Sequence, residues 1–553
     1  MKYKSLFFAC ILVLVFGLFS GCTPNQPTAP MMTTAEEYGY PWWNDAVFYQ
    51  IFVRSFYDSD GDGIGDFNGI TEKMDYLNDG DPETDTDLEI TGIWLMPIYP
   101  SPSYHGYDVT DFTGINPDYG TMEDFENFLT AAHERGIKVI LDWEINHTST
   151  EHPWFKASID PESDYRDWYV WEKDEPDWTG PWGQDVWHRN LEAGASYYGI
   201  FWEGMPDLNY KNPAVTDAMN QAVSFWIEEV GVDGLRIDAA RHLIEEGPKQ
   251  QNTEATHEWY QEWFPWFKDL DAPQEPMVIG EVWDASRNAA RFVDDQELDL
   301  VFDFDLAGGL VEAVNYGYGI KITSAIEDEL SYFPEYQMGT FLSNHDMARV
   351  MTVFRDDYGK AKVAATALLT APGIPFVYYG EEIGMEGGKP DENIRRPMQW
   401  DDSDFAGFTT GDAPWKMPQR DYTDKNVAMQ DLDEASLLNH YRKLINMRNQ
   451  YPVLKIGDYL PIDVSDITVY AAMRSTEEQK FIVLVNMTEN EVTDYTISLK
   501  NGPLEGDYQV VEFFSDIEYS VPNLTANADG GFDNYTPLVT LEPYETYILW
   551  LSE

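Results

Sequence analysis

Four short apolar runs in this chain each end in a carboxylate side chain: Asp142, Asp238, Glu281 and Asp346. Helix-like stretches separate the runs, and this alternation predicts parallel strands. In a closed parallel barrel the carboxyl ends of all strands open onto one face, so these side chains would meet in one cleft. Asp and Glu paired in a cleft suit cleavage of a glycosidic bond, in which one is the nucleophile and the other donates a proton.

The strands that must position these carboxylates number eight, counted as short apolar runs along the chain. The chain has 553 residues, too many for one ordinary domain, and suits a barrel with additions. We therefore expect an α/β fold with a TIM (β/α)8 barrel, the architecture that eight such strands form. Four of the expected strands cover residues 46–53, 93–96, 300–304 and 375–379. The other four end at Asp142, at Asp238, at Glu281 and near Asn344.

Two segments interrupt the barrel pattern. After the third expected strand, residues 147–212 form a long polar stretch rich in Trp, which we predict to be an inserted small domain, domain B. Short β-branched and aromatic runs over 456–553 predict a C-terminal antiparallel β-sandwich. The barrel then comprises 41–146 and 213–455, with helices near 215–229 and 435–449.

The N-terminal segment is typical of a secretory signal. Two lysines precede an apolar run over 6–19 that is too short to span a bilayer, and Leu18-Phe-Ser-Gly-Cys22 resembles a bacterial lipoprotein processing site. We expect a signal peptide over 1–21, lipidation of Cys22 and a tether over 22–40; a plain secretory signal cut nearby is the alternative. The protein would be extracytoplasmic, either anchored to the bacterial cell membrane by this lipid alone or secreted.

The charge is strongly negative, with 98 acidic side chains against 35 Lys and Arg and a net charge of −63. Such a surface repels nucleic acid and other polyanions but not a neutral substrate. At about 1 M salt the screening length falls to about 3 Å and most of the self-repulsion disappears. We therefore predict a halophilic protein; an ordinary acidic secreted protein is the alternative.

Four segments resemble the conserved regions of the α-amylase superfamily, glycoside hydrolase family thirteen, in the order in which that family carries them. The resemblance covers about residues 41–550 and is closest to the intermediate group between oligo-1,6-glucosidases and neopullulanases, through Met205-Pro-Asp-Leu-Asn209. The four segments are Asp142-Trp-Glu-Ile-Asn-His147, Gly234-Leu-Arg-Ile-Asp238, Gly280-Glu-Val-Trp283 and Asn344-His-Asp346.

The resemblance implies a role for each site residue. Asp238 would be the nucleophile, Glu281 the general acid/base, and Asp346 the group that holds two sugar hydroxyls. Arg236, two residues before Asp238, faces the same side of the strand and would keep the nucleophile ionised. The same resemblance places His105, His147, His345 and Arg395 around the sugar at the cleavage point, Tyr107 stacked on it, and Arg241 and His242 on the leaving-group side.

An acidic loop near the first strand suits a metal ion. Carboxylates alternate with Gly and Ser, and several oxygens on a tight loop favour Ca²⁺ over Mg²⁺. The loop also resembles the calcium loop of part of the family, whereas an acidic surface turn is the alternative. The expected ligands are Asp58, Asp60, Asp62, the backbone of Ile64, and Asp66.

Single positions favour internal cleavage of α-1,4 bonds. Ala239 follows the nucleophile where relatives that cut α-1,6 bonds often carry Val, and Tyr104 stands where exo-acting glucosidases place an Asp. We expect a retaining α-amylase that acts on starch, glycogen and maltooligosaccharides as a monomer, its partner being the neutral α-glucan. An α-glucosidase or a cyclomaltodextrinase/neopullulanase activity is the alternative within this class, and a non-catalytic sugar-binding member is the alternative outside it.

Overall fold

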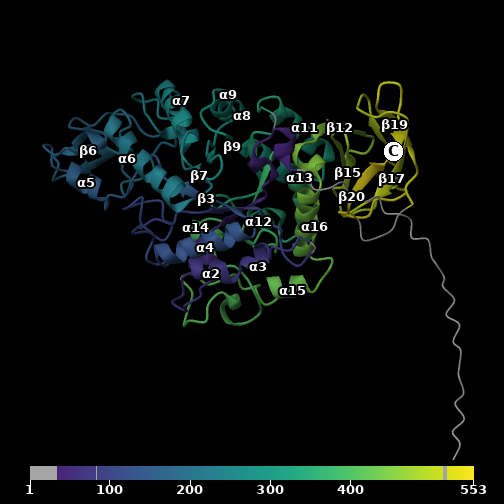
Figure 1. Ribbon diagram of the computed structural model, residues 1–553, viewed down its shortest axis with the longest axis horizontal. Coiled ribbons are helices and arrows are strands. Elements are labelled where there is room, and N and C mark those ends of the chain that lie inside the picture. Colours follow the sequence, from purple (N-terminus) through teal and green to yellow (C-terminus); the bar gives the residue numbers. More distant parts are fainter. Residues whose placement is uncertain (1–33, 83, 335, 515–519, 553) are drawn as a thin grey trace, which may run out of the picture.

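The computed structural model describes residues 34–82, 84–334, 336–514 and 520–552 (Figure 1). The predicted signal peptide, Cys22 and most of the predicted tether lie outside these residues. The end of that tether is folded: Ala35–Tyr38 form a 3-10 helix, and the buried Ala35 donates its backbone N–H to the Asp45 carboxylate at 2.8 Å. Folded structure therefore begins a few residues before the expected start of the barrel.

Eight parallel strands close into a barrel in the ring order β1-β11-β10-β9-β8-β7-β3-β2. Pairing of β1 with β11, with Phe48 opposite Phe376, closes the ring. The predicted fold class, including the inserted domain and the C-terminal β domain, is confirmed. The strands are β1 Phe48–Ile51, β2 Gly92–Leu95, β3 Lys138–Trp143, β7 Gly234–Ile237, β8 Met277–Gly280, β9 Leu300–Phe302, β10 Met338–Phe341 and β11 Ile374–Tyr378.

Large apolar side chains fill the inside of the barrel, as the near-continuous apolar strands require. Phe48 and Phe376 stack with ring centroids 4.6 Å apart, and Phe302 contacts Phe376 edge-on. Gly92 makes room for this packing, since a Cβ there would lie 2.5 Å from the Phe48 ring. The side chains that face outward pack against the surrounding helices in a second, larger core.

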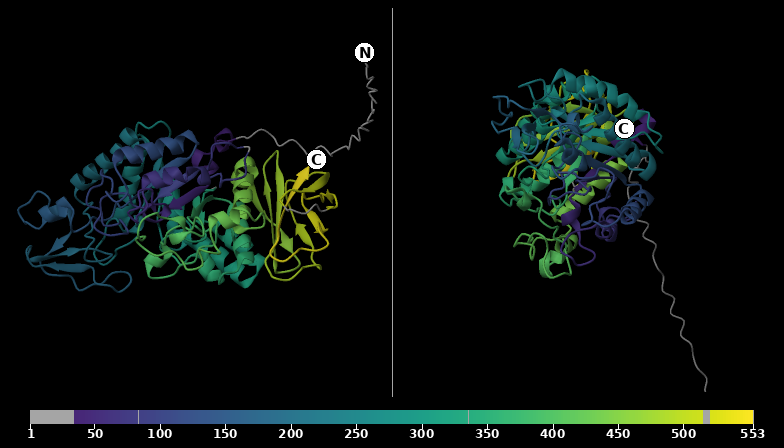
Figure 2. Two further views of the ribbon diagram at one scale, coloured as in Figure 1. Left: turned by 90° about the horizontal axis from the view of Figure 1, so that it is seen from below. Right: turned by 90° about the vertical axis from the view of Figure 1, so that its left-hand side faces the viewer.

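Amphipathic helices cover the outside of the barrel (Figures 1 and 2). The predicted helix at 215–229 is α6, which continues as the π-helix Phe225–Val230; the one at 435–449 is α16, capped by Ser436. The longer helices are α4 Met122–Glu134, α6 Pro213–Ser224, α7 Glu254–Lys268, α10 Phe304–Tyr316, α11 Gly319–Leu330, α13 Tyr358–Thr370 and α16 Leu437–Gln450. The short ones are α1 Val53–Phe56, α2 Phe67–Glu72, α3 Met74–Leu77, α5 Pro153–Ser158, α8 Ser286–Ala289, α9 Arg291–Asp294, α12 Val350–Phe354, α14 Asp391–Ile394, α15 Val427–Asp431 and α17 Pro452–Ile456.

The insertion between β3 and α6 forms a small lobe at one end of the molecule, at the left of Figure 1. Its sheet has the order β4-β6-β5, with strands β4 Trp171–Glu172, β5 Trp187–Asn190 and β6 Ala195–Tyr198. A small aromatic core centred on Trp187 and Tyr198 holds the lobe together. A bridge between His147 and Asp207 ties the two ends of the insertion to each other, and a bridge between Tyr169 and Leu208 ties an inner segment to its second end.

Two antiparallel sheets at the opposite end pack face to face around their own core. A six-stranded sheet has the order β12-β14-β15-β20-β17-β18, and a three-stranded sheet has the order β13-β16-β19. The strands are β12 Asp458–Pro461, β13 Asp463–Val464, β14 Val469–Ser475, β15 Lys480–Asn486, β16 Ile497–Leu499, β17 Asp507–Glu512, β18 Leu524–Thr525, β19 Phe532–Tyr535 and β20 Thr546–Ser552. Within the described ranges, no helix is both long and apolar enough to cross a bilayer.

Candidate active site

A cavity of about 760 Å³ opens at the carboxyl ends of the barrel strands. Its walls come from the loops after β2, β3, β7, β8, β10 and β11, so it lies where the parallel barrel gathers its strand ends. Nine of the eleven predicted catalytic and substrate-binding residues line it: His105, Tyr107, His147, Asp238, Arg241, His242, Glu281, Asp346 and Arg395. The other two, Arg236 and His345, are fully buried behind this wall.

The guanidinium of Arg236 joins three carboxylates at the base of the cavity. Nη1 donates to Asp142 Oδ1 at 2.6 Å and to Asp238 Oδ1 at 2.7 Å, and Nη2 donates to Glu281 Oε2 at 2.8 Å. The three acids come from the neighbouring strands β3, β7 and β8, which bring their carboxyl ends to one side of the ring. Asp238 and Glu281 are therefore close enough to share one cation.

Burial raises the pKa values of both cavity carboxyls by making their charged forms less favourable. It raises the pKa of Asp238 to about 6, against the opposing charge of Arg236. Burial and the negative charge of Asp238 together raise the pKa of Glu281 to about 7, although the positive charge of Arg236 acts to lower it. Near pH 6.5, roughly midway between these values, the pair can hold one proton on Glu281 while Asp238 is ionised.

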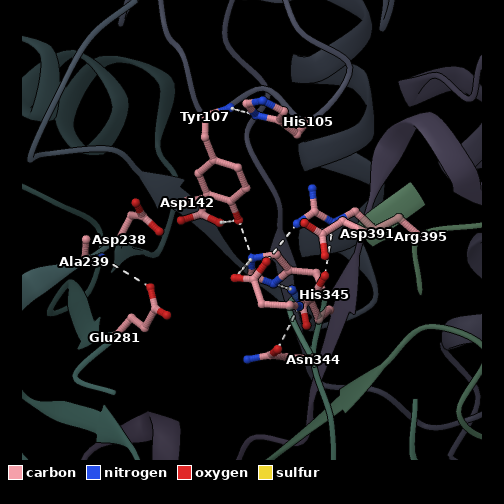
Figure 3. Close-up of polar contacts among 12 residues, drawn as sticks. His105, Tyr107, Asp142, Asp238, Ala239, Glu281, Asn344, His345, Asp391 and Arg395 are labelled. Carbon is pink, nitrogen blue, oxygen red and sulfur yellow. Dashed lines mark hydrogen bonds and ion pairs between the residues drawn. The ribbon is translucent and has the colours of Figure 1, made fainter. Parts of the chain in front are cut away.

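Backbone geometry next to Asp238 also favours contact with Glu281. Ala239 adopts the left-handed conformation with φ of 50°, which is strained for a residue with a side chain. Its N–H points to Glu281 Oε2 at 3.3 Å (Figure 3). The strand end thus supplies a neutral donor to the carboxyl group that also contacts Arg236.

The third cavity acid, Asp346, is held ionised. Burial alone would raise its pKa, but interactions with His345 and Arg395 hold that pKa well below its usual range. Arg395 Nη2 donates to Asp346 Oδ1 at 2.8 Å, and His345 Nε2 lies 3.1 Å from Oδ2. Gln50 of β1 contacts His345 Nδ1 at 2.7 Å and fixes the ring from behind.

Tyr107 forms the floor between the acids and the histidines (Figure 3). Its hydroxyl lies 3.0 Å from Asp142 Oδ2 and 2.6 Å from His345 Nε2, and its ring stacks on the His345 ring. His147 Nε2 lies 3.1 Å from the Tyr107 backbone carbonyl, and burial lowers the pKa of His147 to about 3. Neutral imidazoles and a fixed phenol ring make a wall suited to a neutral, hydroxylated ligand.

Aromatic side chains dominate the wall beyond Glu281. Trp182, Trp202 and Trp283 expose 57%, 47% and 45% of their surface there, which is unusual for side chains of this size. Trp283 stacks on Phe304 with ring centroids 4.6 Å apart, and Trp182 lies over His242. Burial lowers the pKa of His242 to about 4, so its imidazole is neutral at pH 7, beside the charged Arg241.

The acidic loop brings three of its predicted ligands together. Carboxylate oxygens of Asp58, Asp60 and Asp66 lie within 4.8 Å of one another, close enough for one hard cation. Asp62 is not part of this group, and its Oδ1 accepts the Ile64 backbone N–H at 2.8 Å. The donor set is thus all oxygen and fits Ca²⁺, although Asp58 and Asp66 also accept hydrogen bonds from the loop backbone.

Several wall residues were not among the predicted site residues. Trp283 could have been predicted, since it follows Glu281 by two positions at a strand end. No pattern in the sequence indicated Lys389, on the loop after β11, or Asp391, at the start of α14. Asp142 was expected at the cleft without a role, and the structure makes it a partner of Arg236. Beside it the fully buried Glu144 makes no hydrogen bond to another described residue through either carboxylate oxygen.

Comparison with known proteins places the chain in a family. The family model described as the α-amylase catalytic domain matches residues 50–457, from within β1 to the end of the barrel, and includes domain B. The chain therefore belongs to the α-amylase family, glycoside hydrolase family thirteen. It is a glycoside hydrolase with the TIM barrel of that family.

Named relatives within the family differ in activity. An α-amylase of Dictyoglomus thermophilum, "Alpha-amylase 3", is 39% identical over 469 residues, which cover 84% of this chain and 88% of the relative. An oligo-1,6-glucosidase of Parageobacillus thermoglucosidasius is 32% identical, with 85% of this chain and 95% of the relative covered. The solved α-amylase structure of H. orenii superposes with a TM-score of 0.78 at 38% identity, covering 92% of this chain and 99% of that one.

Proposed function

We propose that this protein is a retaining α-amylase that cleaves internal α-1,4-glucosidic bonds of starch, glycogen and maltooligosaccharides. The observation that carries the proposal is the position of Asp238 and Glu281 on one shared guanidinium, in a cavity that continues on both sides of them. A double displacement needs the two carboxyl groups close together, about 5–5.5 Å apart. Internal cleavage needs room for sugars on either side of the pair.

In the proposed mechanism Asp238 attacks the anomeric carbon while Glu281 protonates the departing glycosidic oxygen. The bond between that carbon and the oxygen breaks, and a glycosyl ester forms on Asp238. Glu281 then takes a proton from water, whose oxygen attacks the anomeric carbon; the bond from that carbon to the Asp238 oxygen breaks and the carboxylate is freed. Asp346 would hold two sugar hydroxyls, and Tyr107 would stack beneath the same ring. His105, His147 and Arg395 would surround this sugar, with His345 behind the wall supporting Tyr107 and Asp346.

The shape of the cavity supports sugars on both sides. Tyr104, Lys389 and Asp391 form one end, from segments after β2 and β11, the two strands that flank β1. Trp283, Arg241 and domain B form the other, from loops after β3, β7 and β8. The wall of the cavity thus extends well beyond the reacting carboxylates, and the second end would hold the leaving part of the chain.

A chain-end-specific α-glucosidase is the second candidate, and one observation favours it. Lys389 forms an ion pair with Asp391 at the Tyr104 end, which narrows the space for further sugars on that side. Such an enzyme, or a cyclomaltodextrinase/neopullulanase, would use the same carboxylates. Chromatography of products from amylose separates them: mixed maltooligosaccharides early in the digest support internal cleavage, whereas glucose alone supports the α-glucosidase.

The catalytic roles are tested separately from substrate choice. A mechanism-based fluorosugar should form an ester with Asp238, and Asp238→Asn should lose activity by several orders of magnitude because no neighbouring group can form this ester. Glu281→Gln should lose less activity on a substrate whose leaving group needs no proton. A label on Glu281 or Asp346 would contradict these roles.

We also propose a Ca²⁺ ion held by Asp58, Asp60 and Asp66, with Asp62 and the Ile64 carbonyl as further ligands after a small rearrangement. The ion would neutralise acids that otherwise repel one another and would tie the loop down. Asp58 also bonds to Thr409, and Trp415 donates its backbone N–H to Gly63 at 2.8 Å, so the loop supports the segment 409–415. The ring of Trp415 in turn stacks on Tyr104 at the cavity wall.

The location of the protein is a separate proposal. We propose export and lipidation at Cys22, with the enzyme outside the cytoplasm, acting as a monomer on a neutral glucan and binding no nucleic acid. The net charge of −63 supports the last point. Incorporation of a labelled fatty acid that Cys22→Ser abolishes is the expected result, and secretion of an unlabelled chain would contradict it.

A further inference from the structure

A second cavity, of about 550 Å³, lies where the barrel meets the C-terminal domain. Its walls come from the first turns of α13 and α16, from α15, and from the turn before β20. It shares no lining residue with the cavity that holds Asp238. Its lining includes Tyr358, Lys362, Gln430, Asp433, Tyr544 and Glu545.

Tyr544 is held in this wall at a conformational cost. Its φ of 54° lies in the left-handed region, which a residue with a side chain seldom adopts. Its ring lies directly on Gly359 at the start of α13, where a Cβ would come within 2.2 Å of the ring. The Tyr544 hydroxyl lies 3.4 Å from Asp357, the N-cap of α13. Backbone strain of this kind persists where the surroundings fix it and is concentrated at ligand sites.

The chemistry of the lining fits a neutral, hydroxylated ligand. Two phenol rings offer apolar surface, and carboxylate and ammonium groups offer hydrogen-bond acceptors and donors around them. An anionic ligand would have to approach a chain with net charge −63, near Asp433 and Asp424 of the lining. A volume of about 550 Å³ falls within the range of small-molecule sites.

We propose that this cavity is a second binding site for α-glucan chains, with Tyr544 and Tyr358 as its aromatic contacts. The inference rests on the proposed α-glucan substrate. Helices of a (β/α)8 barrel begin near the carboxyl ends of the strands they follow, so the start of α13, after β10, lies at the catalytic end of the barrel. Both cavities therefore lie toward the same end of the barrel, where one long glucan would contact them together.

The benefit of such a site depends on the length of the substrate. Once one segment of a polysaccharide is bound, a second segment is presented at a high effective concentration, so a weak site adds usefully to the overall affinity. A short oligosaccharide cannot occupy both sites at once. The second site should therefore favour glycogen over maltotetraose, even though it contributes nothing to bond cleavage.

Binding stoichiometry tests the proposal on the full chain. Calorimetry with maltoheptaose, on a chain carrying Asp238→Asn to prevent turnover, should give two ligands per chain. Tyr544→Gly added to it should give one, because Gly removes the ring and tolerates the left-handed backbone. One ligand per chain before this change, or two after it, would overturn the proposal.

Kinetics gives an independent test in the active enzyme. Tyr544→Gly should lower the ratio of kcat/KM on glycogen to kcat/KM on maltotetraose by about tenfold, since a weak site contributes only part of the gain of full bivalency. Gly359→Ala should lower it too, because the added methyl displaces the ring, whereas Tyr544→Phe should largely preserve it. Tyr316, 62% exposed on α10, provides the control Tyr316→Ala, which should leave the ratio unchanged.

Different results would refute the second binding site and the proposed α-amylase function. Equal ratios in Tyr544→Gly and the parent enzyme would refute the second site and leave the active site untouched. A parent enzyme that does not hydrolyse maltotetraose would instead refute the proposed function, whatever the stoichiometry of maltoheptaose binding.

Discussion

Replacement of Arg236 by Met should move the pH profile of the enzyme to higher pH. In the parent, kcat/KM should fall below about pH 6 as Asp238 gains a proton and above about pH 7 as Glu281 loses one. Arg236 opposes the effect of burial on both groups from 2.7 and 2.8 Å. Without it, both pKa values should rise, and both limbs of the profile should shift in the same direction.

The size of the shift follows from the geometry. A cation at this distance lowers the pKa of a carboxyl by about one to three pH units. Loss of Arg236 should therefore reduce the ionised fraction of Asp238 at pH 7 from about nine-tenths to between about a half and a hundredth. The protonated fraction of Glu281 rises at the same time, so activity at pH 7 should be nearly unchanged for a shift of about one pH unit and should fall about fiftyfold for a shift of about three, with recovery by about pH 8 to 9.

The assay is kcat/KM on maltotetraose across pH 4 to 10, with the fold checked by circular dichroism. Arg236→Lys is the matched control: an ammonium keeps one positive charge but cannot span three carboxylates, so its shift should be smaller. If the folded Arg236→Met variant loses activity while its limbs stay near pH 6 and 7, Arg236 does not control ionisation of the pair and the reasoning is refuted.

Three further outcomes are expected. Asp60→Ala removes the exposed member of the acidic cluster, so chelator should lower the melting temperature of the parent but not of this variant. An equal response of both would argue against the site. Stability and activity should hold or rise from about 0.1 M to above about 1 M NaCl at saturating calcium, whereas a steady fall in melting temperature would contradict halophily. Burial raises the pKa of Glu144 well above its usual range, so the native state binds its proton more tightly and loses stability as pH rises through neutrality. In Glu144→Gln the free energy of unfolding, measured with denaturant, should therefore fall less steeply with pH, by up to about 1.4 kcal/mol per pH unit. An unchanged slope would contradict this expectation.

The barrel was predictable because each strand is a short apolar run that ends at a chemically distinctive residue. Asp142, Asp238 and Glu281 mark the ends of β3, β7 and β8 within one residue. Helix limits were less accurate, since Ser436 rather than Ala435 caps α16, and nothing in the sequence indicated the π-helical turn after α6.

The site was predictable as a set of residues but not as a network. A spacing of two in a strand predicts that Arg236 lies beside Asp238, and the structure places it there. Its contacts with Asp142 and Glu281 depend on β3 and β8 being the neighbours of β7, which is a property of the closed ring. Lys389 reaches the cavity along an irregular loop whose path depends on packing between distant segments, so no local pattern indicates it.

Closure of the ring has a consequence for how the enzyme acquires activity during folding. Gln50 and His345 are 295 residues apart, and their contact depends on β1 joining β11. Contacts of such long sequence separation form late, because the entropy of a large loop must be lost before they give any stabilisation. Neighbouring β3 and β7 can unite Arg236 with Asp142 and Asp238 earlier. In a refolding experiment, helical signal should therefore return before catalysis, and the lag between them measures the final joining of the two ends of the barrel sheet.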